Sequence, residues 1–218
     1  MSETGTVGGT GEKPGIAAFD FDGTLTRKDT LAPFLVRAHG WRRLTMAVLA
    51  GRGALRDAAT SDHALLRDRL KIATIDHLFS GMSTARLSEL AQDYAAQLAH
   101  RLRPEMLDRL RWHQDRNHAV VIVSASLAAY LRPLAAELDI DDVLAVELVA
   151  DSDGFLTGAV AGGVNTRGPH KLERLHAWIE GRFGADTTIE LWAYGNSVGD
   201  RELLTAADHP TWVGRRRR

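Results

Sequence analysis

The sequence contains no cysteine, which excludes disulfide bonds, thiolate catalysis and metal sites built on thiolates. It also lacks an apolar run of about 20 residues, the length of a bilayer-spanning helix, so we expect no membrane span. The formal net charge is only −1, and no overall electrostatic field draws the chain to nucleic acid or anionic lipid. The start shows no basic stretch followed by an apolar segment, the mark of a secretory signal. We therefore expect a cytoplasmic protein without a nucleic-acid partner.

The composition is otherwise that of an ordinary globular protein, with 44% apolar and 25% charged residues. A chain of 218 residues can form one large domain, or a core with a smaller insert. Residues 1–15 are rich in Gly, Thr and Glu, and we interpret them as a disordered tail. Residues 214–218 end in four arginines, which we interpret as a solvated basic tail. The oligomeric state cannot be read from the sequence.

Short apolar runs alternate with helical patterns through much of the chain. Buried strands are predicted in three places, at residues 16–19, 119–123 and 188–194. Helices are predicted at residues 104–116 and 171–183, and from about residue 200. Two further apolar runs, 143–149 and 155–161, flank a turn sequence and predict a hairpin. Strands that alternate with helices predict an α/β fold with a parallel sheet.

A purely helical stretch interrupts this alternation after residue 30. Ser83 is a good N-cap, and apolar residues from 87 to 102 recur behind it at helical spacing. Apolar residues between 65 and 72 predict another helix before it. Because this stretch carries no strand signal, we interpret residues 31–104 as a helical cap. The core then consists of residues 16–30 and 105–213.

Polar clusters follow all three predicted core strands. They are Asp20 to Thr24, Ser124 to Ser126, and Gly195 to Asp200. In an open parallel sheet, ligands bind beyond the carboxyl ends of the strands. If the three strands are neighbours, the clusters meet at one site, and Lys171, at the start of a predicted helix, can reach it.

These side chains suit phosphoryl transfer. Of two carboxylates two residues apart, one can attack phosphorus, and the other can give a proton to the leaving oxygen and later take one from water. Oxygen ligands suit Mg²⁺, which reduces the repulsion between a carboxylate and a phosphate dianion. A lysine and hydroxyl groups can hold the oxygens of the transferred group.

The clusters resemble, in order and spacing, the four motifs of the haloacid dehalogenase superfamily. The run from Asp20 to Thr26 resembles the first motif, Ser124 the second, Lys171 the third, and Gly195 to Asp200 the fourth. The resemblance extends from about residue 16 to 213. An insert directly after the first motif is similar to the helical cap of the phosphoserine-phosphatase-like branch. The resemblance implies a Rossmann-like three-layer core with a parallel sheet and an inserted helical cap.

The resemblance also implies chemical roles for the motif residues. Asp20 would be the nucleophile that forms an aspartyl-phosphate, and it would also bind the metal. Asp22 would be the general acid and base, and its backbone carbonyl would be a second metal ligand. Ser124 and Lys171 would bind phosphate.

The fourth motif departs from the usual pattern at Asn196, where the family usually has Asp. The resemblance implies that Asn196 and Asp200 complete the Mg²⁺ site. An amide oxygen can bind Mg²⁺ but brings no charge. We expect either weaker metal binding or a larger contribution from Asp200.

Two residues near the cap are assigned by spacing alone. Asp29 and Arg69 fall near the positions that hold the substrate's charged groups in phosphoserine phosphatases. A solvated helix residue is the plainer interpretation of Arg69.

The sequence thus predicts a Mg²⁺-dependent hydrolase of a small phosphorylated metabolite, with phosphoserine and histidinol phosphate as examples from the family. A phosphotransferase, in which an alcohol replaces water, would carry the same motifs. A phosphate-binding or regulatory module with reduced turnover is favoured only by Asn196. The substrate itself depends on cap geometry, which the sequence does not give.

Overall fold

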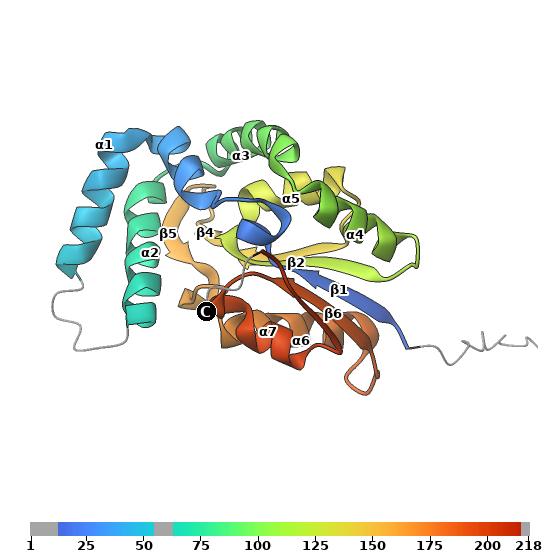
Figure 1. The fold of residues 1–218 in the computed structure, drawn as a ribbon. Coiled ribbons are helices and arrows are strands. Elements are labelled where there is room, and N and C mark those ends of the chain that lie inside the picture. Colours follow the sequence, from blue (N-terminus) through green and yellow to red (C-terminus); the bar gives the residue numbers. More distant parts are fainter. Residues whose placement is uncertain (1–12, 55–62, 215–218) are drawn as a thin grey trace, which may run out of the picture.

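The structure, a computed structural model, describes residues 13–54 and 63–214 (Figure 1). Its centre is a five-stranded parallel sheet in the order β3-β2-β1-β6-β7. The strands are β1 (Gly15–Phe19), β2 (Ala119–Leu127), β3 (Asp142–Val146), β6 (Glu190–Gly195) and β7 (His209–Trp212). The predicted α/β fold is therefore confirmed. Apart from residues 13–15 and 214, the tails predicted at 1–15 and 214–218 lie outside the described residues.

Helices cover both faces of this sheet and make three layers (Figure 1). On one side lie α4 (Pro104–Gln114) and α5 (Ala128–Glu137), and on the other α6 (Pro169–Phe183) and α7 (Arg201–Ala206). Successive residues of β1 point to opposite faces, so Ala17 and Phe19 join the first core cluster while Ile16 and Ala18 join the second. Burial on both faces explains why the core strands read as continuous apolar runs.

The stretch between β1 and α4 is helical, as predicted. It contains α1 (Leu31–Ala54), α2 (His63–Phe79) and α3 (Thr84–Leu98). Ser83 is the N-cap of α3, and its side chain accepts a hydrogen bond from the backbone N–H of Arg86 at 3.2 Å. None of the helices described is long and apolar enough to cross a bilayer. The division into cap and core at residues 31–104 remains our interpretation.

The prediction of one strand at residues 143–149 is wrong, because two separate strands form there. β3 ends at Val146 in the parallel sheet, and the chain then leaves it to form β4 (Leu148–Ala150). β4 pairs in antiparallel fashion with β5 (Leu156–Val160), which confirms the predicted hairpin. The hairpin joins the end of α2 through hydrogen bonds of Leu156, whose carbonyl accepts from Gly81 and whose N–H donates to Met82, both at 2.8 Å. A segment from the core part of the sequence therefore packs on the helical stretch.

Candidate active site

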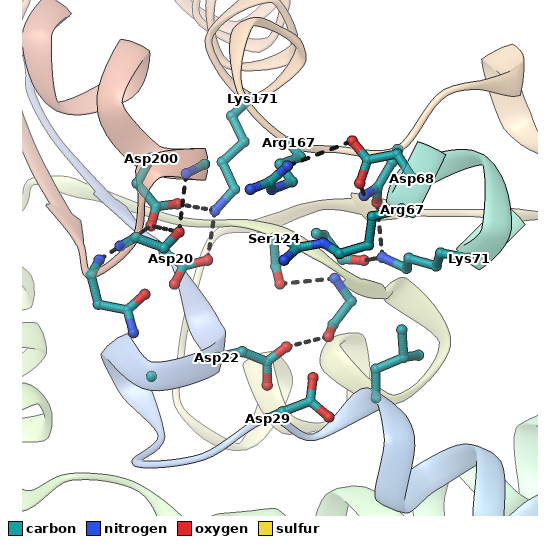
Figure 2. Close-up of a pocket in the computed structure, with 18 of the residues that line it drawn as sticks. Asp20, Asp22, Asp29, Arg67, Asp68, Lys71, Ser124, Arg167, Lys171 and Asp200 are labelled. Atoms are coloured by element: carbon teal, nitrogen blue, oxygen red, sulfur yellow. Dashed lines mark hydrogen bonds and ion pairs between the residues drawn. The ribbon is translucent and has the colours of Figure 1, made fainter. Parts of the chain in front are cut away.

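The carboxyl ends of β1, β2 and β6 open into one cavity of about 510 Å³. Phe19 at the end of β1 pairs with Ile122 of β2 and with Tyr194 of β6, so the residues that come next in each strand lie near the same level. β2 continues beyond that level to Leu127. The three polar clusters are thereby brought together, as the sequence predicts (Figure 2). The predicted strand end at residue 123 is wrong, because β2 includes Ser124 to Ser126 and ends at Leu127. The predicted site residues that line the cavity are Asp20, Asp22, Asp29, Ser124, Lys171, Asn196 and Asp200.

Lys171 joins two carboxylates at the base of this cavity. Its Nζ lies 2.5 Å from Asp20 Oδ1 and 2.6 Å from Asp200 Oδ1 (Figure 2). Lys171 is only 2% exposed, and a buried ammonium needs such partners. It lies in the first turn of α6, where helical side chains tilt toward the N-terminus of the helix and hence toward the sheet edge.

The three charged groups have shifted pKa values. Burial raises the pKa of Asp20 to about 6, although the Lys171 ammonium opposes the shift. For Lys171, burial alone favours the neutral amine, but the carboxylates of Asp20 and Asp200 outweigh it and raise the pKa. Burial also disfavours the Asp200 carboxylate, yet Lys171 and hydrogen bonds from Ser197 lower its pKa. Asp20 is therefore the less stabilised, more basic carboxylate of the pair.

Asp200 also fixes the loop that carries Asn196. Its Oδ2 accepts hydrogen bonds from the backbone N–H groups of Asn196 at 3.2 Å and Ser197 at 2.9 Å, and from Ser197 Oγ at 2.8 Å. Ser197 Oγ in turn accepts from the Gly199 N–H, which completes a capping box. Gly195 is required here because a Cβ atom would lie 2.5 Å from the Cβ of Asp200. The shape of this loop is thus encoded within the loop itself.

Gly23 allows the first and fourth motifs to touch. Its φ is +84°, a conformation that favours glycine, and a Cβ at this position would lie 1.9 Å from Asn196 Nδ2. The absence of a side chain therefore leaves room for Asn196 against the loop that carries Asp20 and Asp22.

Asp22 lies on a different side of the cavity from Lys171 (Figure 2). Its Oδ1 accepts hydrogen bonds from the Thr30 N–H at 2.8 Å and the Thr30 hydroxyl at 2.7 Å, and its Oδ2 accepts from the Ser126 hydroxyl. Burial raises the pKa of Asp22, while the bonds from Ser126 and Thr30 partly offset that shift. Asp22 is therefore oriented by neutral hydroxyls and holds a proton more readily than an exposed carboxyl would.

Two predicted residues also have local structural roles. Ser124 Oγ accepts a hydrogen bond from the Ser126 N–H at 3.0 Å, and Ser124 is 1% exposed. Asp29 Oδ2 accepts from the Ala32 N–H at 3.0 Å, in the first turn of α1. Both residues line the cavity, so each can contact a ligand while it supports the backbone.

The cap residues that line the cavity are not the one predicted from the sequence, Arg69. Arg69 is exposed and is not among the residues that line the cavity. Arg67, Asp68 and Lys71 line it instead. Residues four apart lie on the same side of a helix, so Arg67 and Lys71 share a face of α2, whereas a residue two positions on points away. The helical periodicity of α2 could have revealed this.

Lys71 is held in place by polar groups from both the core and the loop before α6. Its Nζ donates hydrogen bonds to the Ala125 carbonyl and, at 2.8 Å, to Asn165 Oδ1. Asn165 Nδ2 donates to Asp68 Oδ1 at 2.9 Å. Burial lowers the pKa of Lys71 to about 8, although nearby carboxylates, Asp68 first, oppose the shift. Sequence reasoning missed Lys71 and Asn165 because no motif marks either residue.

The donor set around Asp20 fits a hard divalent cation. Carboxylates of Asp20 and Asp200, the amide of Asn196 and the Asp22 carbonyl all offer oxygen atoms, which Mg²⁺ prefers. Among the described residues, no three or more His, Cys, Asp or Glu side chains form a group that could hold a metal. A cation at this site would therefore depend on two carboxylates together with neutral oxygens.

Comparison with known proteins shows the family. The model of the haloacid dehalogenase-like hydrolases matches residues 17–205. Protein CicA from Caulobacter vibrioides strain NA1000 is 33% identical over 209 residues, which cover 93% of this chain and 87% of CicA. The chain belongs to the haloacid dehalogenase-like hydrolase family, and the resemblance seen in the sequence is confirmed.

Solved structures share the fold at lower identity. A protein of unknown function from Bordetella pertussis Tohama I superposes with a TM-score of 0.72 at 20% identity, over 91% of this chain and 89% of its own. A phosphoserine phosphatase, solved as an analogue of its phospho-aspartyl intermediate, superposes with a TM-score of 0.55 at 17% identity, over 90% and 84%. These matches confirm the α/β core with its helical cap.

Proposed function

We propose that this protein is a Mg²⁺-dependent phosphomonoester hydrolase in which Asp20 forms an aspartyl-phosphate. The observation that carries the proposal is the different surroundings of two carboxylates in one cavity. Asp20 contacts the Lys171 ammonium and also accepts a hydrogen bond from the Thr24 hydroxyl at 2.9 Å. The side-chain partners of Asp22 are instead the neutral hydroxyls of Thr30 and Ser126. Two carboxyl groups with distinct surroundings can act as nucleophile and as general acid.

In the first step, a carboxylate oxygen of Asp20 attacks phosphorus, and the bond from phosphorus to the leaving oxygen breaks. Asp22 gives its proton to that oxygen, so the product leaves as a neutral alcohol. The raised pKa of Asp22 supports this role, because the acid must carry a proton when the step begins. Lys171 and Ser124 offer donors to the oxygens of the transferred group.

In the second step, a water molecule attacks the phosphorus of the aspartyl-phosphate. Asp22, now a carboxylate, takes a proton from that water, and the bond between phosphorus and Asp20 breaks to release inorganic phosphate. Lys171 remains between Asp20 and Asp200 and balances the returning charge on Asp20. The same carboxyl group thus acts first as an acid and then as a base.

Asp20, Asp200, Asn196 and the Asp22 carbonyl would hold the Mg²⁺ ion. When bound, Mg²⁺ supplies positive charge that reduces the repulsion between the nucleophile and the phosphate dianion. Asp200 brings a full charge to this set because its pKa is lowered, whereas Asn196 brings none.

The substrate class we propose is the phosphomonoester of a small metabolite. The cavity of about 510 Å³ can hold a phosphate and a modest leaving group. Lys71, Arg67 and Asp29 also line the cavity and are the candidates for contacts with that group. The similarity in fold to a phosphoserine phosphatase supports a phosphomonoester as substrate.

Hydrolysis of p-nitrophenyl phosphate across a Mg²⁺ titration tests the proposal. We expect turnover that rises with Mg²⁺ and disappears in Asp20→Asn, with the fold of the variant intact by circular dichroism. Activity of Asp20→Asn close to that of the wild type would rule out the mechanism.

Two other functions use the same residues. A phosphotransferase would pass the group to an alcohol, and added glycerol would then yield glycerol phosphate in place of inorganic phosphate. A binding module with reduced turnover is favoured by Asn196 alone, and it would bind phosphate with no p-nitrophenol released.

A further inference from the structure

An apolar groove of about 550 Å³ runs between α1 and α2 on the outside of the cap. The side chains that form it share an apolar character for most of its length, and no acidic residue lines it. They include Trp41, Leu44, Val48 and Leu49 of α1, with Leu70 of α2. Figure 1 shows α1 and α2 side by side at the edge of the molecule farthest from α4 and the adjoining end of the sheet.

The groove meets the catalytic cavity at two cations. Arg67 and Lys71 line both spaces, so the catalytic cavity and the groove are neighbours on either side of these residues. Lys71 also donates a hydrogen bond to the Ala125 carbonyl, which belongs to the polar cluster near the end of β2. A molecule with an anionic end in the cavity could therefore extend an apolar chain into the groove past two positive charges.

Two apolar side chains of the groove are unusually open to water. Trp41 is 70% exposed and Leu49 is 54% exposed, two turns further along the same side of α1. Single exposed apolar residues are common, but apolar residues gathered in a groove mark a binding surface. Exposure of this kind has a free-energy cost that a bound apolar chain would remove.

The backbone of α1 is adapted to form the groove. Gly40 has φ +78° within the helix, so α1 bends just before Trp41. Gly51 lies against α2, where a Cβ atom would be 3.1 Å from Leu70 Cδ1. The two helices therefore approach closely at Gly51, and Arg52 and Leu70 beside this contact also line the groove.

We propose that this groove binds the hydrocarbon chain of an amphiphilic phosphomonoester, that is, a phosphorylated lipid. The phosphate would occupy the catalytic cavity, and the chain would pass Arg67 and Lys71 and lie along Leu44, Val48 and Leu49. This inference rests on the proposed phosphatase reaction and replaces the small leaving group considered above with a long-chain alcohol. A small polar leaving group would leave the groove empty.

Alkyl phosphates of increasing chain length, from butyl to decyl, test the inference below their micelle-forming concentrations. We expect kcat/KM to rise with each added methylene, by up to about fourfold, until the groove is filled. A flat dependence on chain length, in an enzyme that hydrolyses p-nitrophenyl phosphate, would overturn the inference and leave the proposed phosphatase intact.

Two substitutions on the same helix distinguish loss of chain binding in the groove from the general effect of an added negative charge. Leu49→Glu should bring kcat/KM for decyl phosphate down to that for butyl phosphate within the variant. Met46→Glu is the matched control, because Met46 is 62% exposed and does not line the groove. Its chain-length dependence should equal that of the wild type. Equal losses in both variants would contradict a specific groove.

Fluorescence of Trp41 gives a readout that does not need turnover. Decyl phosphate should change the emission of the Asp20→Asn protein, butyl phosphate should not, and Trp41→Phe should remove the change. If these changes are seen but the wild-type protein does not hydrolyse p-nitrophenyl phosphate, the groove is supported and the proposed reaction is contradicted. Light scattering tests whether a second copy of the chain occupies the groove instead. A wild-type dimer that dissociates in Leu49→Glu would show that it does and would contradict our inference.

Discussion

At the scale of single residues, the site is defined by what surrounds each carboxyl group. Asp20, Asp22 and Asp200 all line one cavity, yet Lys171 contacts only Asp20 and Asp200. Asp22 has hydroxyl and amide partners instead. The proposed roles follow from these partners rather than from proximity alone.

The proton donor can be tested through the leaving group. Asp22→Asn should slow hydrolysis of alkyl phosphates by about 10²–10⁴-fold, because a poor leaving group needs the proton. The loss with p-nitrophenyl phosphate should be much smaller, since p-nitrophenolate leaves without protonation. The measurement is kcat for a series of phosphomonoesters whose alcohols differ in pKa. Equal losses across the series would assign Asp22 another role.

The metal site can be tested at Asn196. Asn196→Asp should lower the Mg²⁺ concentration for half-maximal activity, because a carboxylate adds charge to the ligand set. Asp200→Asn should cost far more activity than Asn196→Ala, since it removes the only acidic side chain of this loop. It should also lower the melting temperature, because Asp200 accepts hydrogen bonds from Lys171 and Ser197. Unchanged Mg²⁺ dependence in all three variants would show that this loop does not hold the metal.

The charge of Lys71 predicts how KM depends on pH. Its pKa is lowered to about 8, so its charge is complete well below pH 8 and is lost as the pH rises through that value. If Lys71 binds the anionic end of the substrate, KM should rise above pH 8 by about 10–100-fold, the value of a charge-assisted hydrogen bond. Lys71→Arg keeps its charge at any such pH and should remove this rise. Arg69→Ala is the control and should leave KM unchanged, and a rise that persists in Lys71→Arg would have another origin.

Residues that carry a motif could be predicted from the sequence, and those that complete the site could not. Asp20 and Asp22 follow β1 and Lys171 lies in the first turn of α6, so the sheet topology brings them together. Lys71 meets Ala125 and Asn165 through contacts between segments far apart in the sequence, and no local pattern records such contacts.

At the scale of elements, the β4–β5 hairpin shows what the sequence left undetermined. The turn residues predicted the hairpin itself, but not that it would pack on α2. β7 was also missed, because its four residues are all exposed and include Pro210, which weakens any strand pattern. Docking of one element on another depends on shape, as at Gly158, where φ is +87° and a Cβ would lie 2.8 Å from the Asp76 carbonyl oxygen.

Gly158→Ala should therefore lower the free energy of unfolding by about 1–3 kcal/mol, since the added methyl group presses on the backbone of α2. Gly162→Ala is the matched control. Gly162 also has a positive φ, +73°, but nothing lies within 4 Å of its Cβ position, so it reports backbone strain alone. Urea denaturation of both variants gives the comparison. Equal losses would mean that the contact with α2 contributes nothing.

At the scale of the whole molecule, core and cap both contribute to the cavity. The core supplies the residues proposed for chemistry, and α2 supplies Arg67, Asp68 and Lys71. Changes in α2 should therefore alter which substrate is used, while changes at the strand ends should alter whether any is used. These two effects can be separated because the two groups of residues come from different parts of the fold.

Oxygen exchange tests the central claim, the covalent intermediate on Asp20, most directly. Inorganic phosphate labelled with heavy oxygen is incubated with the enzyme and Mg²⁺ in ordinary water, without any alcohol. If phosphate forms an aspartyl-phosphate by reversal of the second step, it loses an oxygen to water, and repeated cycles remove the label. We expect loss of label with the wild type and none with Asp20→Asn. A wild-type enzyme that hydrolyses phosphomonoesters yet leaves the label untouched would contradict the account.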